Sequence, residues 1–268
     1  MRSTPMFRAP PVHALRALLC AVSLSASCTL QNIPPTDDPE YGAGPLALVA
    51  SDPPSGGTGV GRLPSIVLTF DGFPDPGSVA SFGPLSLHSG TNSLDYVAHV
   101  DLVGRAIVMQ PRNPLAPDTQ YTAQIRSSIR SLDGRSPPRD LFVRFTTGPS
   151  TATTTGGDRH GPAPRSLAAD VQPRFDRSCA LAGCHDAEAR AGALDLSSAK
   201  ASLASLVCVA AVQVKLARVV SGVPESSYVL RKLLGTPGIQ SAPMPPGNRW
   251  ADDDIRVVSD WIATGATP

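Results

Sequence analysis

The sequence has almost no net charge and few lysines. Its 268 residues carry 23 Lys and Arg against 22 Asp and Glu, which gives a formal net charge of +1. The only lysines are Lys200, Lys215 and Lys232. A chain this close to neutrality lacks the basic surface with which proteins bind nucleic acid or an anionic membrane face. We therefore expect no nucleic-acid partner.

Long apolar runs are also missing. The apolar stretch "ALLCAVSL" at 17–24 is too short to span a bilayer. It follows three arginines and precedes "SASC" at 25–28, an order typical of an export signal. Residues 1–28 resemble a bacterial lipoprotein signal, which implies that Cys28 carries lipid, and plain secretion is the alternative. We expect a cell-envelope protein, lipid-anchored to the outer membrane or facing the periplasm, that contacts the membrane only through this anchor.

Cysteine is scarce, with five residues in the chain. Cys20 would leave with the signal and Cys28 would be blocked by lipid. Three thiols then remain, Cys179, Cys184 and Cys208, which is an odd number in a compartment that favours disulfides. After Cys28, residues 29–45 are polar and Pro-rich, which predicts a flexible tether.

Proline and glycine, in contrast, are abundant, at 28 and 23 residues. Between their clusters, residues 46–148 hold short β-branched and apolar segments that predict strands: "SIVLTF" at 65–70, "AIVMQP" at 106–111, "QYTAQI" at 120–125 and "LFVRFTT" at 141–147. Strands at this spacing are typical of a sandwich of about a hundred residues.

The order of these segments resembles a bacterial Ig-like domain, most clearly in "NPLAPDTQYTAQI", where Leu115 would enter the core and Tyr121 a strand. Such domains are usually spacers or binding modules. His88 and His99 stand alone and are expected at the surface or an edge, and Met109 is expected in the core.

Residues 149–165 form a Gly/Thr/Pro linker, and 166–268 are predicted to be mainly helical. Leu167, Val171 and Phe175 make one apolar stripe. The segment 224–235 has Pro at its start and Gly at its end, and 252–265 has acids in its first turn. The apolar stripe of this last helix consists of Ile255, Val258 and Ile262.

The stretch "RSCALAGCHDAEA" at 177–189 carries the chemistry. A c-type haem requires two thiols for its vinyl groups and an adjacent imidazole for its iron. Cys179, Cys184 and His185 offer all three, although four residues separate the cysteines instead of two. Met244, in "APMPPG", is the one methionine of the last hundred residues and could supply a distal thioether.

A disulfide or a zinc site would also use these cysteines. A disulfide between Cys179 and Cys184 would leave His185 and Met244 without a role. A structural zinc site could take Cys179, Cys184, His185 and Cys208, since zinc wants four ligands. Cys208, however, lies in the apolar run "LVCV" and is expected to be a buried, inert thiol.

The stretches "SCALAGCH", "GALDLSS", "APMPPG" and "VVSDWIATGA" together resemble the cytochrome c-like domains of exported bacterial proteins. The resemblance implies one covalent haem c, with Cys179 and Cys184 as thioether residues, His185 as the proximal ligand and Met244 as the distal ligand. It also implies that the last helix packs against the first.

The predicted fold is therefore two-domain: an N-terminal all-β Ig-like sandwich and a C-terminal mainly α cytochrome c-like domain. The predicted function is one-electron transfer at the cell envelope to an unknown redox partner protein, as an electron carrier with no catalytic residues. The alternative is a surface structural or binding lipoprotein whose cytochrome-like domain is haem-free and closed by a disulfide. A haem enzyme such as a peroxidase would need an open distal position, and this region offers no second distal His.

Overall fold

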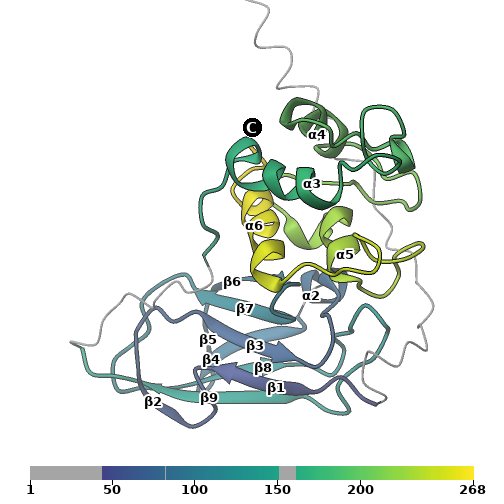
Figure 1. Ribbon diagram of the computed structural model, residues 1–268. Helices are drawn as coiled ribbons and strands as arrows, with labels where there is room; N and C mark the ends of the chain where they lie inside the picture. The colour runs from purple at the N-terminus through teal and green to yellow at the C-terminus, as the bar shows by residue number, and fades with distance from the viewer. Residues whose placement is uncertain (1–43, 82, 151–160) are drawn as a thin grey trace, which may run out of the picture. The chain divides into compact units, whose positions relative to one another are not determined.

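The computed structural model describes residues 44–268, apart from residue 82 and residues 151–160 (Figure 1). All the described residues belong to one compact unit. The predicted signal, Cys28, most of the tether and the centre of the 149–165 linker lie outside the described residues.

Two sheets make up the first part of this unit (Figure 1). One sheet has the order β1 (Leu48–Asp52), β3 (Ile66–Phe70), β7 (Ala106–Pro111) and β6 (Tyr96–Asp101), with all neighbours antiparallel. The other has the order β2 (Gly57–Val60), β9 (Leu141–Thr147), β8 (Gln120–Ile125), β4 (Leu85–Ser89) and β5 (Asn92–Ser93). In this second sheet only β2 and β9 pair in parallel among the described residues. The short helix α2 (Pro76–Ala80) connects β3 to β4.

The period of two along each strand sorts side chains between the core and solvent. On β9, Val143 and Phe145 are each 1% exposed, whereas Phe142, which precedes Val143, is 44% exposed. Tyr121 is also buried and stacks on Phe145, with ring centroids 5.9 Å apart. Its hydroxyl accepts a hydrogen bond of 2.8 Å from the Ala116 N–H, so the ring fills the core while its polar end is satisfied.

The lone residues of the sandwich lie as predicted, except His88, which is neither exposed nor on an edge strand. Met109 and Leu115 are buried. His99 is exposed on β6, an edge strand of its sheet, and His88 is half-buried on β4. The four strands predicted from the sequence all form, within one residue of the predicted bounds.

Residues 161–268 are built from short helices joined by long loops. They are a π-helical turn η3 (Leu167–Val171), α3 (Gln172–Ser178), a 3-10 turn η4 (Ala191–Ala193), α4 (Ala199–Leu206), a 3-10 turn η5 (Pro224–Ser226), α5 (Tyr228–Leu234) and α6 (Asp252–Ala263). The predicted helix over 224–235 is thus interrupted at Ser227, whose backbone is extended. It ends where predicted, at Gly235, which has a φ of +67° that favours glycine.

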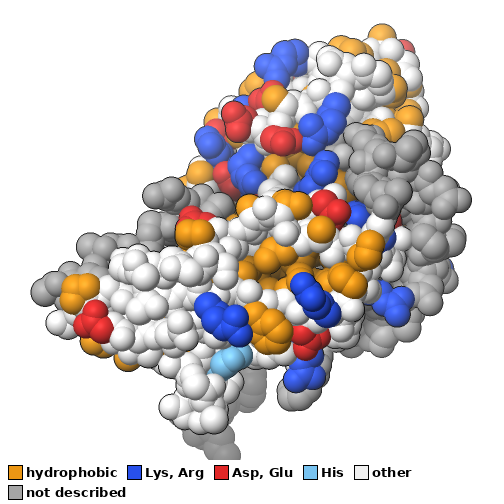
Figure 2. Space-filling view, turned by 90° about the horizontal axis from the view of Figure 1, so that it is seen from below, with side chains coloured by type: hydrophobic (Ala, Val, Ile, Leu, Met, Phe, Trp, Pro, Cys, Tyr) orange, Lys and Arg blue, Asp and Glu red, His pale blue; other side chains and the backbone are white. Residues whose placement is uncertain are grey.

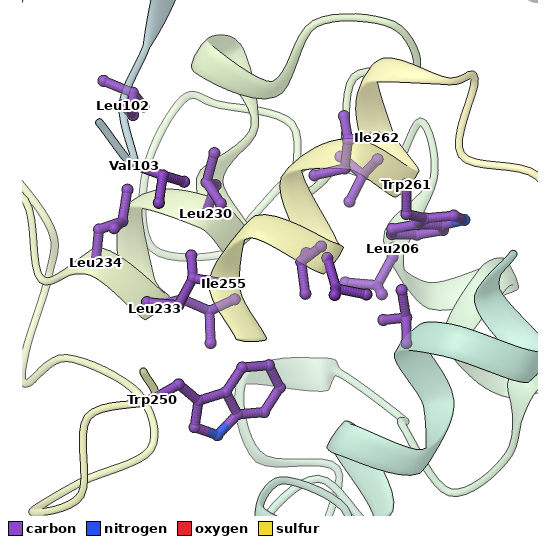
Figure 3. Close-up of a cluster of buried hydrophobic side chains, with 14 of the residues drawn as sticks. Leu102, Val103, Leu206, Leu230, Leu233, Leu234, Trp250, Ile255, Trp261 and Ile262 are labelled. Atoms are coloured by element: carbon purple, nitrogen blue, oxygen red, sulfur yellow. The ribbon is translucent and has the colours of Figure 1, made fainter. Parts of the chain in front are cut away.

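Helix α6 lies at the centre of the hydrophobic cluster of this region (Figure 3). Its predicted stripe of Ile255, Val258 and Ile262 is fully buried, as is Trp261. Leu102 and Val103, which follow β6 in the sandwich, belong to the same cluster. The cluster also includes the three apolar residues of the predicted first stripe, so the last helix and the first share one core.

Candidate functional site

The four residues between Cys179 and Cys184 form a closed turn. Cys179 ends α3, where its N–H donates to the Phe175 carbonyl at 2.7 Å. Cys184 then donates to the Leu181 carbonyl at 2.9 Å. The His185 N–H donates back to the Cys179 carbonyl at 3.1 Å, which closes the turn. Despite the four intervening residues, the turn brings Cys184 and His185 back beside Cys179.

A single carboxylate organises the chain after this turn. Asp186 accepts hydrogen bonds from the backbone N–H groups of Ala189, Gly183 and Glu188 at 2.6, 3.1 and 3.2 Å. These bonds, that from Ala189 foremost, lower the pKa of the Asp186 carboxyl. Gly183 has a φ of +79°, a left-handed conformation that side chains disfavour. Asp186 thus binds the backbone both before and after Cys184 and His185, which fixes the loop that carries them.

The His185 imidazole is held in one tautomer. Its Nδ1 lies 2.9 Å from the Ala191 carbonyl oxygen, and a carbonyl can only accept, so Nδ1 carries the proton. Burial lowers the pKa of His185, which favours the neutral ring. In a neutral imidazole protonated on Nδ1, Nε2 keeps its lone pair and is available to a metal.

The two predicted thiols differ in environment. Cys179 is 8% exposed, and its burial raises the pKa of the thiol to about 11. Cys184 is exposed. Both are free thiols and are not bonded to each other.

All four predicted site residues line one cavity of about 370 Å³. Cys179, Cys184 and His185 come from one end of α3 and the turn after it, and Met244 comes from the loop before α6. The rest of the wall is largely apolar and includes Phe175, Leu194, Leu196, Leu206, Val229 and Leu233. A cavity of this size falls within the range of about 300–1,000 Å³ that binds small molecules and cofactors.

Two buried cations also line this cavity, and sequence reasoning did not predict them. Arg218 is 7% exposed and donates from its two terminal nitrogens to the carbonyls of Ser205 and Gly192, each at 2.8 Å. Lys232 is 8% exposed and donates to carbonyls of the loop that carries Met244. Burial lowers the pKa of both groups. Within the part of the chain that the structure describes, neither cation forms an ion pair.

Hydrogen bonds and ring contacts made by neighbouring residues hold the cavity wall in place. The Gln172 amide donates to the Leu196 carbonyl at 2.8 Å and accepts from the Ser202 hydroxyl at 2.7 Å. Trp250 packs against Phe175, with ring centroids 6.2 Å apart, and its Nε1 donates to the Ser178 hydroxyl at 2.9 Å. Gln172 and Ser202 are ordinary polar residues in sequence, so no local pattern marked them.

The expectation that Cys208 is buried is wrong, because Cys208 is exposed. The apolar run does not continue as a helix: α4 ends at Leu206, and Cys208 has a φ of +58° in the turn beyond it. Cys208 is also not among the residues that line the cavity. Among the described residues, no group of three or more His, Cys, Asp or Glu is placed to hold a metal ion, which gives the zinc alternative no support.

The class of the first region follows from its two packed sheets, which make an immunoglobulin-like sandwich. Residues 43–147 match the family described as the bacterial Ig-like domain. This match supports the predicted Ig-like sandwich. No curated protein matches the chain.

Several solved structures resemble the chain at low identity. The N-terminal part of the bacterial S-layer protein SbsC is 14% identical, with a TM-score of 0.31, over 46% of this chain and 25% of that one. The copper resistance protein PcoC from Escherichia coli is 21% identical, with a TM-score of 0.29, over 38% of this chain and 98% of that one. CopC from Methylosinus trichosporium OB3b is 19% identical, with a TM-score of 0.32, over 39% of this chain and 95% of that one. The chain spans a quarter of the S-layer structure. Similarity at such low identity and TM-score gives no information about the function of this chain.

A bacterial Ig-like domain suggests an extracellular or envelope protein. Over residues 44–268, with the gaps noted above, no helix has the length and apolar character needed to cross a membrane.

Proposed function

We propose that residues 166–268 bind one covalent c-type haem and that the protein transfers single electrons at the cell envelope. The observation that carries this proposal is the convergence of Cys179, Cys184, His185 and Met244 on one cavity. The first three lie close together in the sequence. Met244 lies in a distant loop, so their proximity in sequence does not explain why it lines the same cavity. Two thiols, an imidazole and a thioether in one apolar cavity are the donor set of a c-type cytochrome.

The local geometry supports these roles. Each thiol would add its S–H across a vinyl group of the haem and form a thioether, with no leaving group. The turn closed between Cys179 and His185 keeps both thiols beside the imidazole. The Ala191 carbonyl orients that imidazole so that Nε2 is the nitrogen that would bind iron.

The cavity also suits the rest of a haem. Its apolar wall would cover the macrocycle and exclude water, which favours electron transfer without binding of oxygen species. A haem bears two carboxylates, and Arg218 supplies a buried positive charge that has no carboxylate partner among the described residues. A haem, when bound, supplies an iron that alternates between the ferrous and ferric states, and the Met244 thioether would favour the ferrous state.

The partner would be another redox protein. Basic and acidic residues balance from 170 onward. On the face shown in Figure 2, basic and acidic side chains are intermixed. Docking through one strong charge patch is therefore not part of the proposal, and a weak dependence of electron-transfer rate on salt is expected.

The deciding experiment is to express the chain with haem-maturation machinery and record the spectrum of the denatured, reduced pyridine adduct. Covalent haem is expected in the wild type and is expected to be lost when Cys179 and Cys184 are both replaced by Ala. Cys208→Ala is the matched control, because it removes a cysteine outside the cavity and should keep the haem. A wild-type chain without covalent haem would exclude the proposal.

The distal ligand has its own test. Met244→Ala should keep the covalent haem but abolish the weak sulfur-to-iron absorption band at long wavelength, because the thioether is gone. Survival of that band would remove Met244 as a ligand.

Attachment to the membrane through lipid on Cys28 is a separate part of the proposal. It rests on the signal-like sequence at 1–28. Cys28→Ala should abolish incorporation of a labelled fatty acid into the chain, and labelling that persists in this variant would exclude Cys28 as the anchor.

A further inference from the structure

The loop that carries Met244 is fastened to α5 from several sides. The Met244 N–H donates to the Lys232 carbonyl at 2.9 Å. This carbonyl belongs to the last turn of α5, where helix carbonyls lack partners within the helix. The loop therefore caps the C-terminal end of α5.

The side chain of Lys232 fastens the same loop a second time. Its Nζ donates to the Gln240 carbonyl at 2.8 Å and to the Ala242 carbonyl. Lys232 is only 8% exposed, these bonds are partly buried, and a charged donor makes the stronger kind of hydrogen bond. One residue thus holds residues 240–244 through both its main chain and its side chain.

Tyr228 of α5 and Gly235, which caps this helix, also lie against the loop. The Tyr228 hydroxyl accepts from the Gln240 N–H at 3.0 Å. At the end of the helix, a Cβ added to Gly235 would meet the Pro243 side chain at 3.0 Å, which shows how closely the loop approaches α5.

We propose that Lys232 is a positioning residue that latches residues 240–246 onto α5 and so holds the Met244 thioether at the cavity. This inference rests on the proposed haem function for its purpose, but the latch itself is a property of the chain. Lys232 acts on the loop and is not itself a ligand. Among the lysines, only Lys232 lines the cavity, whereas Lys200 and Lys215 are exposed.

The test measures amide hydrogen exchange of residues 240–246 in the full-length, haem-free chain. Lys232→Met removes both side-chain bonds and should speed exchange in this segment by about tenfold or more. Lys200→Met is the matched control, because it makes the same change at an exposed position on α4, and it should leave the segment unchanged. Lys232→Arg, which keeps a charged donor, should restore part of the protection.

Unchanged exchange in a folded Lys232→Met variant would overturn the latch. If that variant fails to fold, Tyr228→Phe can replace it. This change removes the bond to the Gln240 N–H and should speed amide exchange in the loop by less than tenfold. In that case a wild-type Met244 amide that exchanges as fast as the amide of the exposed residue Gln213 would also overturn the inference.

The haem-loaded chain gives a second readout. With covalent haem unchanged, Lys232→Met should lose the sulfur-to-iron absorption band at a lower denaturant concentration than the wild type, whereas Lys200→Met should not. If no haem attaches, the proposed function fails while the exchange experiment still decides the latch. If haem attaches and exchange is unchanged, the latch alone fails.

Discussion

In the sandwich the large side chains fill the space between the two sheets, whereas in the helical region Cys179, His185 and Met244 surround a cavity of about 370 Å³. Paired strands give the sandwich its order through backbone hydrogen bonds and a dense core. The helical region has short helices and long loops, and it is ordered by the buried apolar cluster around α6 and by side chains that bind backbone carbonyls, such as Arg218 and Lys232. The comparison indicates that both regions have a buried apolar core, whereas the proposed chemistry belongs to the helical region alone.

The largest expected effect concerns the sandwich. Phe145→Ala removes a fully buried ring and should lower the free energy of unfolding by about 3–5 kcal/mol, because it leaves a cavity in the core. Phe142→Ala removes another ring of the same strand, which is 44% exposed, and should cost less than about 1 kcal/mol. Chemical denaturation measures both values. A fall in covalent haem per folded chain in Phe145→Ala would contradict the assignment of the proposed chemistry to the helical region alone.

The next effect contrasts two thiols of the cavity. In the reduced, haem-free chain at mildly alkaline pH, a thiol reagent should modify Cys184 well before Cys179, because Cys184 is exposed. The pKa of Cys179 is raised from 9.0 to about 11, so its thiolate fraction below pH 9 should be about 100-fold lower than that of an unshifted thiol. Its rate should therefore keep rising with pH until about pH 11. Mass spectrometry of timed samples measures the order, and equal rates would show that Cys179 is not buried as described.

The smallest effect is the acid sensitivity of the loop around Asp186. Its pKa lies below the ordinary value of 3.8, so the charged carboxylate stabilises the fold above that pH, and the contribution is lost as pH falls through the lowered pKa. Asp186→Asn should lower the melting temperature near neutral pH and flatten its fall below about pH 4. Glu188→Gln is the matched control, because it removes a charge from the same loop but keeps the Asp186 carboxylate that accepts the three bonds. An identical acid dependence in wild type and Asp186→Asn would exclude this role.

The sequence predicted the sandwich more fully than the site. Alternation of β-branched and apolar residues predicted the strands, and turn residues predicted their ends, because both depend on local physics. The position of Val143 and Phe145 inside, with Phe142 outside, needed only the period of two once the register was known.

The site residues that the sequence predicted are those whose residue type is rare and chemically distinctive. Cysteine next to histidine, and one methionine, stand out in any sequence. Arg218 and Lys232 do not, because a buried cation is satisfied by carbonyls from distant loops that no local pattern reveals. Cys208 was placed wrongly for a related reason: composition favoured burial, but the helix ends at Leu206 and the chain turns outward.

The hydrogen bond between the Cys179 carbonyl and the His185 N–H has a consequence for how such sites vary. Because the turn closes on itself, the separation of the two thiols in space is set by its ends and not by the number of residues between them. The exposed side chains of the turn are then free to change as long as the closing bond forms and Gly183 keeps its left-handed conformation. The Leu181 side chain is exposed, so its replacement would leave the two cysteines where they are while its carbonyl still accepts the Cys184 N–H.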